Sequence, residues 1–363
     1  MPRRVVAVPK QQALLDLVSH GRKGPGERIH LSPAQIEAVA RTVRQVPEVM
    51  VKVSGGARDA AGAQAHFSYI DRRGNLEVHT DDGRELLGRD AAAELARDWN
   101  LDLSKGQYRP APAEGEKDRR PKVVHNIVLS MPGRTPPEAV LAAAKAFARE
   151  HFALQYRYAM VLHTDQEHPH VHLVVKAEHE YAPGKRLYIR KATLQQWRDD
   201  FARALREQGV AANATPRQVR GQNRTPKKDA IHQRLKAVAD HGRLPDEAKA
   251  TRRAPRESSF MRRKVEQVAR ELQAGALAPE PGKAKLDQTR KAVRAGWLAT
   301  AEVLRAQGQA QLAGEVEAFA RTMPAARTDK EMIAAGLLAR IGARRRRDAP
   351  IDLSRTANQH EGR

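Results

Sequence analysis

The feature that most restricts the fold of this chain is a stretch of histidines and β-branched residues between His163 and Lys176. It reads H-T-D-Q-E-H-P-H-V-H-L-V-V-K, and its second half has the composition of a β-strand. Side chains on a strand alternate between two faces, so His170 and His172 project from the same face. Residues 156–162 also have a strand pattern, and a short polar link joins the two runs. We therefore predict a hairpin that returns His163 beside the pair.

Three converging imidazoles suit a divalent metal with open coordination positions, as in catalytic rather than closed structural sites. We predict that His163, His170 and His172 are the ligands. Asp165 lies close enough in sequence to orient one of them. His168 shares the register of the pair but lies at the turn, so it is the alternative fourth ligand. The competing interpretation is a polar, histidine-rich turn without an ion.

The charge of the chain indicates its partner. Its formal net charge is +22, from 65 Lys and Arg against 43 Asp and Glu, and its pI is about 10.5. Such a protein favours a polyanion, and nucleic acid is preferred over a membrane because no stretch approaches the roughly 18 apolar residues of a spanning helix. The absence of Cys excludes disulfides and thiolate metal sites. The N-terminus lacks an apolar secretory core, so we predict a cytoplasmic protein without membrane insertion.

Helix and strand patterns alternate around the histidine stretch. Ser32, Pro33 and Gln35 form a helix start signal, and Gly74 is placed to stop a later helix. We expect helices at about 32–44, 59–73, 90–99, 135–151 and 194–208, and strands at 46–53, 122–130, 156–162 and 170–175. Asp81 to Gly83 is a turn signal. The core order β-α-β-α-β-β predicts an α+β fold, with a mostly antiparallel sheet and flanking helices.

The composition changes near residue 225, after which Ala, Arg, Lys, Glu and Gln predominate. We predict a loosely ordered basic arm over 1–30, the α+β domain over 31–225, a helical region over 226–342 and a basic flexible tail over 343–363. The helical region should contain helices at 258–275, 285–306, 309–322 and 329–341, with Gly342 as the final stop. Arg344 to Arg347 are either solvated or engage DNA, a secretion apparatus or a transfer signal.

Three motifs resemble those of the conjugative relaxases of the MOB-P class, which belong to the HUH single-strand endonucleases. A-H-F-S-Y-I-D-R-R-G resembles the nucleophile motif, V-V-H-N-I-V-L-S-M-P-G the second motif, and H-T-D-Q-E-H-P-H-V-H-L-V-V the metal motif. The resemblance covers residues 46–225. It implies a relaxase-type sheet and strand-specific nicking at an origin of transfer, with the protein left covalently on the 5′ phosphate during conjugative mobilisation.

The resemblance also implies residue roles. Tyr69 would be the nucleophile, Asp165 the partner of His163, and Ser130 a DNA contact near the nick. The three histidines would hold Mg²⁺ or Mn²⁺. A phenol is a better leaving group than an alkoxide, so a phosphotyrosine link stays nearly reversible.

Further residues around the tyrosine have assigned or open roles. We expect Arg72 and Arg73, just after the tyrosine, to bind DNA as well. The general base is open between Asp165 and His163, and we interpret Asp71 and Glu77 as solvated charges.

The implied partners are single-stranded DNA at the origin of transfer, the coupling protein of a type IV secretion channel and accessory proteins of the relaxosome. The protein would act in the bacterial cytoplasm and could travel with the DNA into a recipient cell. One alternative is a rolling-circle replication initiator of the HUH class, in which the tyrosine motif usually follows the histidines, whereas Tyr69 precedes them. The other is a non-catalytic basic DNA-binding accessory protein whose histidines hold a structural ion.

Overall fold

The computed structural model describes residues 30–101, 110, 112–113, 115–116, 118–222 and 259–347, without the side chains of 344–347. Ser32–Thr215 form one compact unit, which we call the sheet unit. The described residues outside that range form a second unit, which we call the helical unit. The basic arm predicted over 1–30 lies outside the described residues, except for its last residue. Each unit is described by itself.

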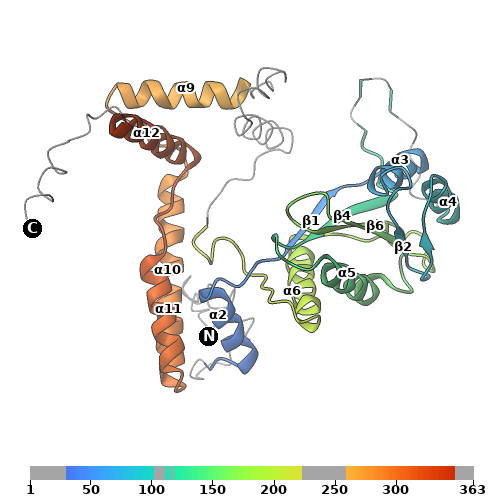
Figure 1. Cartoon of the computed structure of the whole chain (residues 1–363), viewed down its shortest axis with the longest axis horizontal. Helices are drawn as coiled ribbons and strands as arrows, with labels where there is room; N and C mark the ends of the chain where they lie inside the picture. The colour runs from blue at the N-terminus through green and yellow to red at the C-terminus, as the bar shows by residue number, and fades with distance from the viewer. Residues whose placement is uncertain are drawn as a thin grey trace, which may run out of the picture. The chain divides into compact units, whose positions relative to one another are not determined.

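The sheet unit contains six strands and five helices in the part of the chain described. In chain order they are α2 (Pro33–Val43), β1 (Met50–Gly55), α3 (Ala60–Ile70), β2 (Val78–Thr80), β3 (Glu85–Leu86), α4 (Ala91–Asp98), β4 (Val124–Ser130), α5 (Pro137–Phe152), β5 (Tyr158–His163), β6 (His170–Lys176) and α6 (Lys191–Glu207). The strands form one sheet in the order β1-β4-β6-β5-β2-β3, and every neighbouring pair is antiparallel (Figure 1). The predicted α+β fold is confirmed.

The sequence signals account for most element boundaries. Ser32 caps α2 in a capping box with Gln35, as its S-P-A-Q pattern predicts. Strand β1 begins later than predicted, because Pro47 has no N–H to donate to the sheet. Strands β2 and β3 were not predicted, since three and two residues are too few to produce an alternating pattern. The predicted turn at Asp81 to Gly83 connects them.

The two faces of the sheet carry separate hydrophobic cores. On one face, α5 and α6 cover the strands through a cluster that includes Phe147, Trp197, Phe201, Leu129 and Leu173. On the other face, α3 and α4 pack on a cluster that includes Phe67, Leu95, Trp99, Val161 and Val174. Figure 1 shows these helix pairs on opposite sides of the sheet. Alternation along β5 and β6 therefore decides which side chains face α3.

The helical unit contains α9 (Ser259–Gln273), α10 (Lys283–Ala306), α11 (Ala310–Thr322) and α12 (Asp329–Arg347). The buried Trp297 of α10 packs edge-on against Phe319 of α11, with ring centroids 5.2 Å apart. Its indole N–H donates to the Val219 carbonyl at 2.8 Å. None of the helices described is both long enough and apolar enough to cross a lipid bilayer.

Helix α12 corrects one boundary. It continues past Gly342, where we predicted its end, and its last residues are the arginines assigned to the flexible tail. A glycine inside a helix costs only about 1 kcal/mol, and the arginines after it are good helix formers. The rest of that tail, residues 348–363, lies outside the described residues.

Candidate active site

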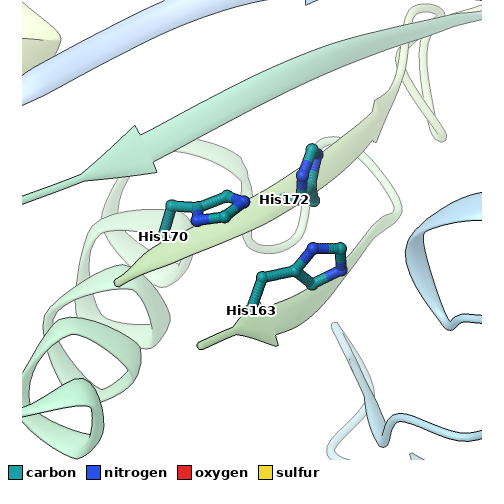
Figure 2. A group of neighbouring side chains, drawn as sticks. All are labelled: His163, His170 and His172. Atoms are coloured by element: carbon teal, nitrogen blue, oxygen red, sulfur yellow. The ribbon is translucent and has the colours of Figure 1, made fainter. Parts of the chain in front are cut away.

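The three histidines of the central stretch come together where β5 and β6 pair. His163 lies directly opposite His170 in the antiparallel register, and His172 lies two residues further along β6. The ring centroids are 5.1 Å apart for His163 and His170, 4.5 Å for His163 and His172, and 5.1 Å for His170 and His172. One nitrogen of each ring lies within 4.8 Å of the others. Figure 2 shows the three imidazoles gathered over the two strands.

Strand alternation puts this histidine trio on the face covered by α3. His163 has the parity of Val161, and His172 has the parity of Val174; both valines belong to the core under α3 and α4. The period of two therefore directs the trio toward the helix that carries Tyr69. The hairpin alone would not have fixed this, because it leaves open which face each helix covers.

Hydrogen bonds orient two of the rings. A carbonyl can only accept, so Nε2–H of His163 donates to the Ile70 carbonyl at 2.6 Å, and Nδ1–H of His170 donates to the His168 carbonyl at 3.0 Å. The opposite nitrogen of each ring keeps its lone pair. Nδ1 of His172 is buried and has no hydrogen-bond partner among the described residues.

The environment favours the neutral form of His163 and His172. Burial, together with the neighbouring His163 and His170, lowers the pKa of His172 to about 3. Burial also lowers the pKa of His163. Neutral imidazole nitrogens are metal donors, and three imidazoles at this separation fit a divalent cation.

Two other groups of potential ligands occur in the described part of the sheet unit: Glu77, His79 and Glu85, and Glu150, His151 and Asp200. Each already has a basic partner. Lys145 lies 3.5 Å from Glu85, and Arg203 lies 2.7 Å from Glu150 and 3.2 Å from Asp200. Existing ion pairs therefore neutralise these carboxylates, and the histidine trio is the better metal site.

Tyr69 lies in the last turn of α3 at the edge of the histidine trio. Its side chain is 59% exposed, and its ring stands edge-on to His172 with centroids 6.4 Å apart. The ring of His66 is stacked with the Tyr69 ring, with centroids 6.1 Å apart, and the Arg72 guanidinium lies 5.3 Å from the Tyr69 centroid. The phenol is thus largely open to solvent and has imidazoles and a cation as neighbours.

Arg72 stands between two residues that we expected to touch. Asp165 accepts a hydrogen bond from Nη2 of Arg72 at 2.7 Å, whereas its nearest approach to Nδ1 of His163 is 4.0 Å. Nη2 of Arg72 also lies 3.2 Å from that nitrogen. Asp165 therefore contacts His163 at ion-pair distance without a direct hydrogen bond, and the Ile70 carbonyl orients the ring.

Arg72 and Asp165 each shift the pKa of the other. Burial lowers the pKa of Arg72, but hydrogen bonds to Asp165 and to the Tyr69 side chain outweigh it and raise the pKa overall. Burial raises the pKa of Asp165, but the hydrogen bond from Arg72 outweighs it and lowers the pKa. Both groups stay charged at neutral pH, and Arg72 is a fixed positive charge beside Tyr69.

Ser130 lies on the same face of the sheet as the histidine trio. It is at the end of β4, directly opposite His170, and is 4% exposed. Its hydroxyl donates to the Pro169 carbonyl at 3.3 Å. The DNA contact by Ser130 stays a prediction.

Sequence reasoning also missed two residues. His66 is half-buried, burial lowers its pKa, and its Nε2 has no hydrogen-bond partner among the residues described. Its spacing of three residues before Tyr69 on a helix was the available signal. Asp71 is 1% exposed, and both carboxylate oxygens lack a described partner, so its interpretation as a solvated charge is wrong. Glu77 is exposed, as interpreted.

Comparisons with known proteins bear on the same region. Residues 89–210 match the family model described as "Relaxase: MobA/VirD2-like, nuclease domain". The match contains the histidine trio and begins after Tyr69. It confirms the resemblance to relaxases, while the MOB-P class stays a prediction.

Curated relatives include the T-DNA border endonuclease VirD2 of Agrobacterium fabrum, which is 27% identical over 201 residues, 52% of this chain and 44% of the relative. VirD2 of Rhizobium radiobacter is 27% identical over 205 residues, 53% of this chain and 47% of the relative. The chain thus spans about half the length of the curated relatives it matches. Among solved structures, a manganese-bound MobM relaxase domain in complex with origin-of-transfer DNA is similar with a TM-score of 0.33 and 12% identity, covering 52% of this chain and 98% of that one.

Proposed function

We propose, on the premise that residues 89–210 are a relaxase nuclease domain, that this protein nicks one DNA strand at an origin of transfer with Tyr69 as nucleophile. The observation that carries the proposal is the position of an exposed phenol beside three clustered imidazoles and the charged Arg72. These groups come from segments about ninety residues apart, joined by the Arg72 and Asp165 contact.

A divalent metal held by His163, His170 and His172 would neutralise the non-bridging oxygens of the phosphate and orient it. We propose Mg²⁺ or Mn²⁺. Three imidazoles bind Zn²⁺ or Ni²⁺ more tightly in general, so the metal in the cell depends on availability. The protein prepares this site by holding two rings through carbonyl groups and keeping the third ring neutral.

In the proposed reaction the Tyr69 oxygen bonds to phosphorus, and the bond from phosphorus to the 3′ oxygen breaks. The phenolic proton leaves the tyrosine, and a proton is added to the departing 3′ oxygen, which becomes a free hydroxyl. The product is a 5′-phosphotyrosyl link that the same 3′ hydroxyl can attack in reverse. Arg72 supplies a guanidinium next to the reacting oxygen, where it donates to phosphate oxygens.

For the proton acceptor, the two residues favoured from the sequence are poorly placed. Arg72 binds Asp165 and lowers its pKa, and both nitrogens of His163 have polar neighbours. We therefore propose His66, whose ring stacks on Tyr69 and whose Nε2 lacks a partner in the described part of the chain. His66→Gln should slow adduct formation and change its pH profile while leaving DNA affinity intact; an unchanged rate would rule the histidine out.

The test of the function is a covalent adduct. The protein is incubated with Mn²⁺ and single-stranded oligonucleotides that cover candidate origins of the host element, and the products are separated on a denaturing gel. We expect an adduct with the unmodified chain and none with Tyr69→Phe, because only the hydroxyl is lost. Tyr181→Phe is the matched control, since Tyr181 is also exposed in the sheet unit, at 76%. An adduct that survives in Tyr69→Phe would refute the assignment.

The cellular setting is proposed from the resemblance. We place the reaction in the bacterial cytoplasm, with relaxosome accessory proteins on the duplex and a type IV coupling protein that passes the protein and its DNA to a recipient. Mating assays that follow the protein in recipient cells test this. Failure to find it there would remove translocation from the proposal without affecting the nicking chemistry.

A further inference from the structure

A second pocket lies beside the helix of the tyrosine. Its volume is about 550 Å³, and it is lined by Ser68, Arg73, Asn75 and Arg89. Ser68 precedes Tyr69 on α3, and Arg89 lies in the turn before α4, the helix next to α3 (Figure 1). All four lining side chains are polar. The pocket is therefore suited to a charged or strongly polar ligand rather than to a nucleobase.

Two glycines fix the shape of this pocket. The Gly88 N–H donates to the Gly74 carbonyl at 3.2 Å, which ties the turn after α3 to the turn before α4. A Cβ on Gly74 would lie 2.2 Å from the Gly88 carbonyl carbon, so no other residue allows this approach. Both glycines have positive φ, 84° and 110°. The two turns therefore hold Arg73 and Arg89 at a set separation.

The charges in the pocket are unbalanced. Within the described residues, neither Arg73 nor Arg89 forms an ion pair, although Arg72 pairs with Asp165 at 2.7 Å and the nearby Arg84 with Asp98 at 2.7 Å. Both pocket arginines are exposed. Asn75 donates its amide N–H to the Arg72 carbonyl at 2.8 Å, which leaves its side-chain oxygen in the pocket wall. Two guanidinium groups facing one polar hollow favour an anion that can accept from both.

We infer that the Arg73–Arg89 pocket binds one backbone phosphate of the DNA strand, distinct from the phosphate that Tyr69 attacks. Consecutive residues of an α-helix point about 100° apart, so Ser68 faces the pocket while Tyr69 faces the histidine trio. A DNA strand bound at both places is held in one register relative to α3. The identification of the ligand as this DNA strand rests on the proposed function. The evidence for an anion pocket comes from the lining residues alone.

The first measurement is the salt dependence of DNA binding by the full-length chain. All variants carry Tyr69→Phe, so that no adduct forms. The probe is a fluorescein-labelled single strand of mixed sequence, about twenty nucleotides long, and its Kd is measured against salt concentration. Arg73→Gln and Arg89→Gln should each weaken binding and reduce the log-log slope by up to about 0.7, the value for one contact on a single strand. The matched control is Arg97→Gln, since Arg97 is an exposed arginine on α4 outside the pocket; it should leave the slope unchanged.

The double variant Arg73→Gln/Arg89→Gln decides whether one phosphate is shared. If both arginines hold the same phosphate, the slope should fall by about 0.7 in total rather than about 1.4. A loss near 1.4 would mean two separate contacts and overturn the pocket. An unchanged slope would also overturn it. Circular dichroism melting of each variant checks that the sheet unit stays folded.

The second measurement locates the phosphate. On an oligonucleotide that yields the adduct, neutral methylphosphonates are placed one at a time on either side of the cleaved bond. One position should weaken binding by Tyr69→Phe about tenfold and have no effect in the triple variant that also carries Arg73→Gln and Arg89→Gln. Equal effects in both backgrounds would overturn the inference. If the chain with Tyr69 forms the adduct but the arginine variants keep the normal salt slope, only the pocket is refuted. If the arginine variants lose salt slope but no adduct forms with Tyr69 present, only the proposed function is refuted.

Discussion

The contacts that build the sheet unit and the helical unit span different separations along the sequence. In the helical unit, α10 packs on α11, the next helix along the chain, through Trp297 and Phe319. In the sheet unit, the contacts that form the site join α3 to the hairpin of β5 and β6 across 93 residues. Local sequence patterns are enough to predict contacts between consecutive helices. The long-range contacts of the site depend on the strand order of the sheet.

Basic side chains form ion pairs in both units. In the helical unit, Lys283 lies 3.2 Å from Glu331, and Arg305 lies 2.6 Å from Glu317; in the sheet unit, Arg203 lies 2.7 Å from Glu150. Arg73 and Arg89 of the sheet unit have no described acidic partner, and both line the pocket beside α3. Unpaired arginines attract a phosphate chain, so the proposed DNA contact and the proposed nucleophile belong to the same unit.

The largest effect that tests this comparison concerns the metal. His170→Ala should weaken Mn²⁺ binding about 100-fold or more in a calorimetric titration, because it removes a ligand nitrogen. His168→Ala is the matched control and should change the affinity far less. Nδ1 of His168 accepts a hydrogen bond from the Gly133 N–H at 2.8 Å, which ties it to the loop after β4. If both variants lose the metal equally, three ligands are too few. Chelation should abolish adduct formation reversibly.

A pair of tryptophans tests whether the two units are separable. Trp197 and Trp297 are both almost fully buried, at 3% and 2% exposure, one in each unit. Replacement of either by Ala should lower the free energy of unfolding of its own unit by about 3–5 kcal/mol. Thermal unfolding measures the loss of stability in each variant. In a separate adduct assay at 25 °C, Trp197→Ala should lower adduct formation and Trp297→Ala should leave it unchanged. Loss of adduct formation in the second variant would show that the chemistry needs the helical unit.

A smaller effect concerns acid stability. Burial, with Lys122 and Arg186 nearby, lowers the pKa of His125 on β4 to about 4. The unfolded chain binds this proton at an ordinary pKa of about 6.5, so the stabilisation is complete above that pH and is lost as the pH falls toward 4. The loss is about 3 kcal/mol at most. The difference between the denaturant midpoints at pH 7.5 and pH 4.5 should be smaller in His125→Asn than in the unmodified chain. An equal difference would mean that other groups cause the acid sensitivity.

The smallest effect on chemistry is expected at the C-terminus. Deletion of residues 343–363 should leave nicking of an oligonucleotide unchanged, because all proposed chemical groups lie in the sheet unit. It should lower transfer between cells and reduce the salt slope of DNA binding by about 0.7 for each arginine that contacts a single strand. A fall in nicking would contradict the separation of the two units. The deletion removes the last turn of α12 as well, so a cut after Arg347 is the control.

The sequence by itself determined most of the backbone elements and the histidine trio. Capping signals such as Ser32 with Gln35 act within one turn of helix, so they predicted α2 closely. The period of two put His170 and His172 on one face, and the short link at the hairpin returned His163 beside them. The motif around Tyr69 suggested the proposed nucleophile through resemblance. All of these signals are carried by neighbouring residues.

Only the tertiary structure decided which side chains meet across the chain. Arg72 bridges Asp165 and His163 because Arg72 itself, two residues after α3, has a φ of 55° and directs its guanidinium to the hairpin. Ser130 lies beside His170 of a strand forty residues later, and the contact of two glycines brings the turns that carry Arg73 and Arg89 together. Such contacts depend on turns of unusual φ and on strand order, which leave no periodic pattern in the sequence. For that reason the histidine trio could be predicted, while the partners of the charges around it could not.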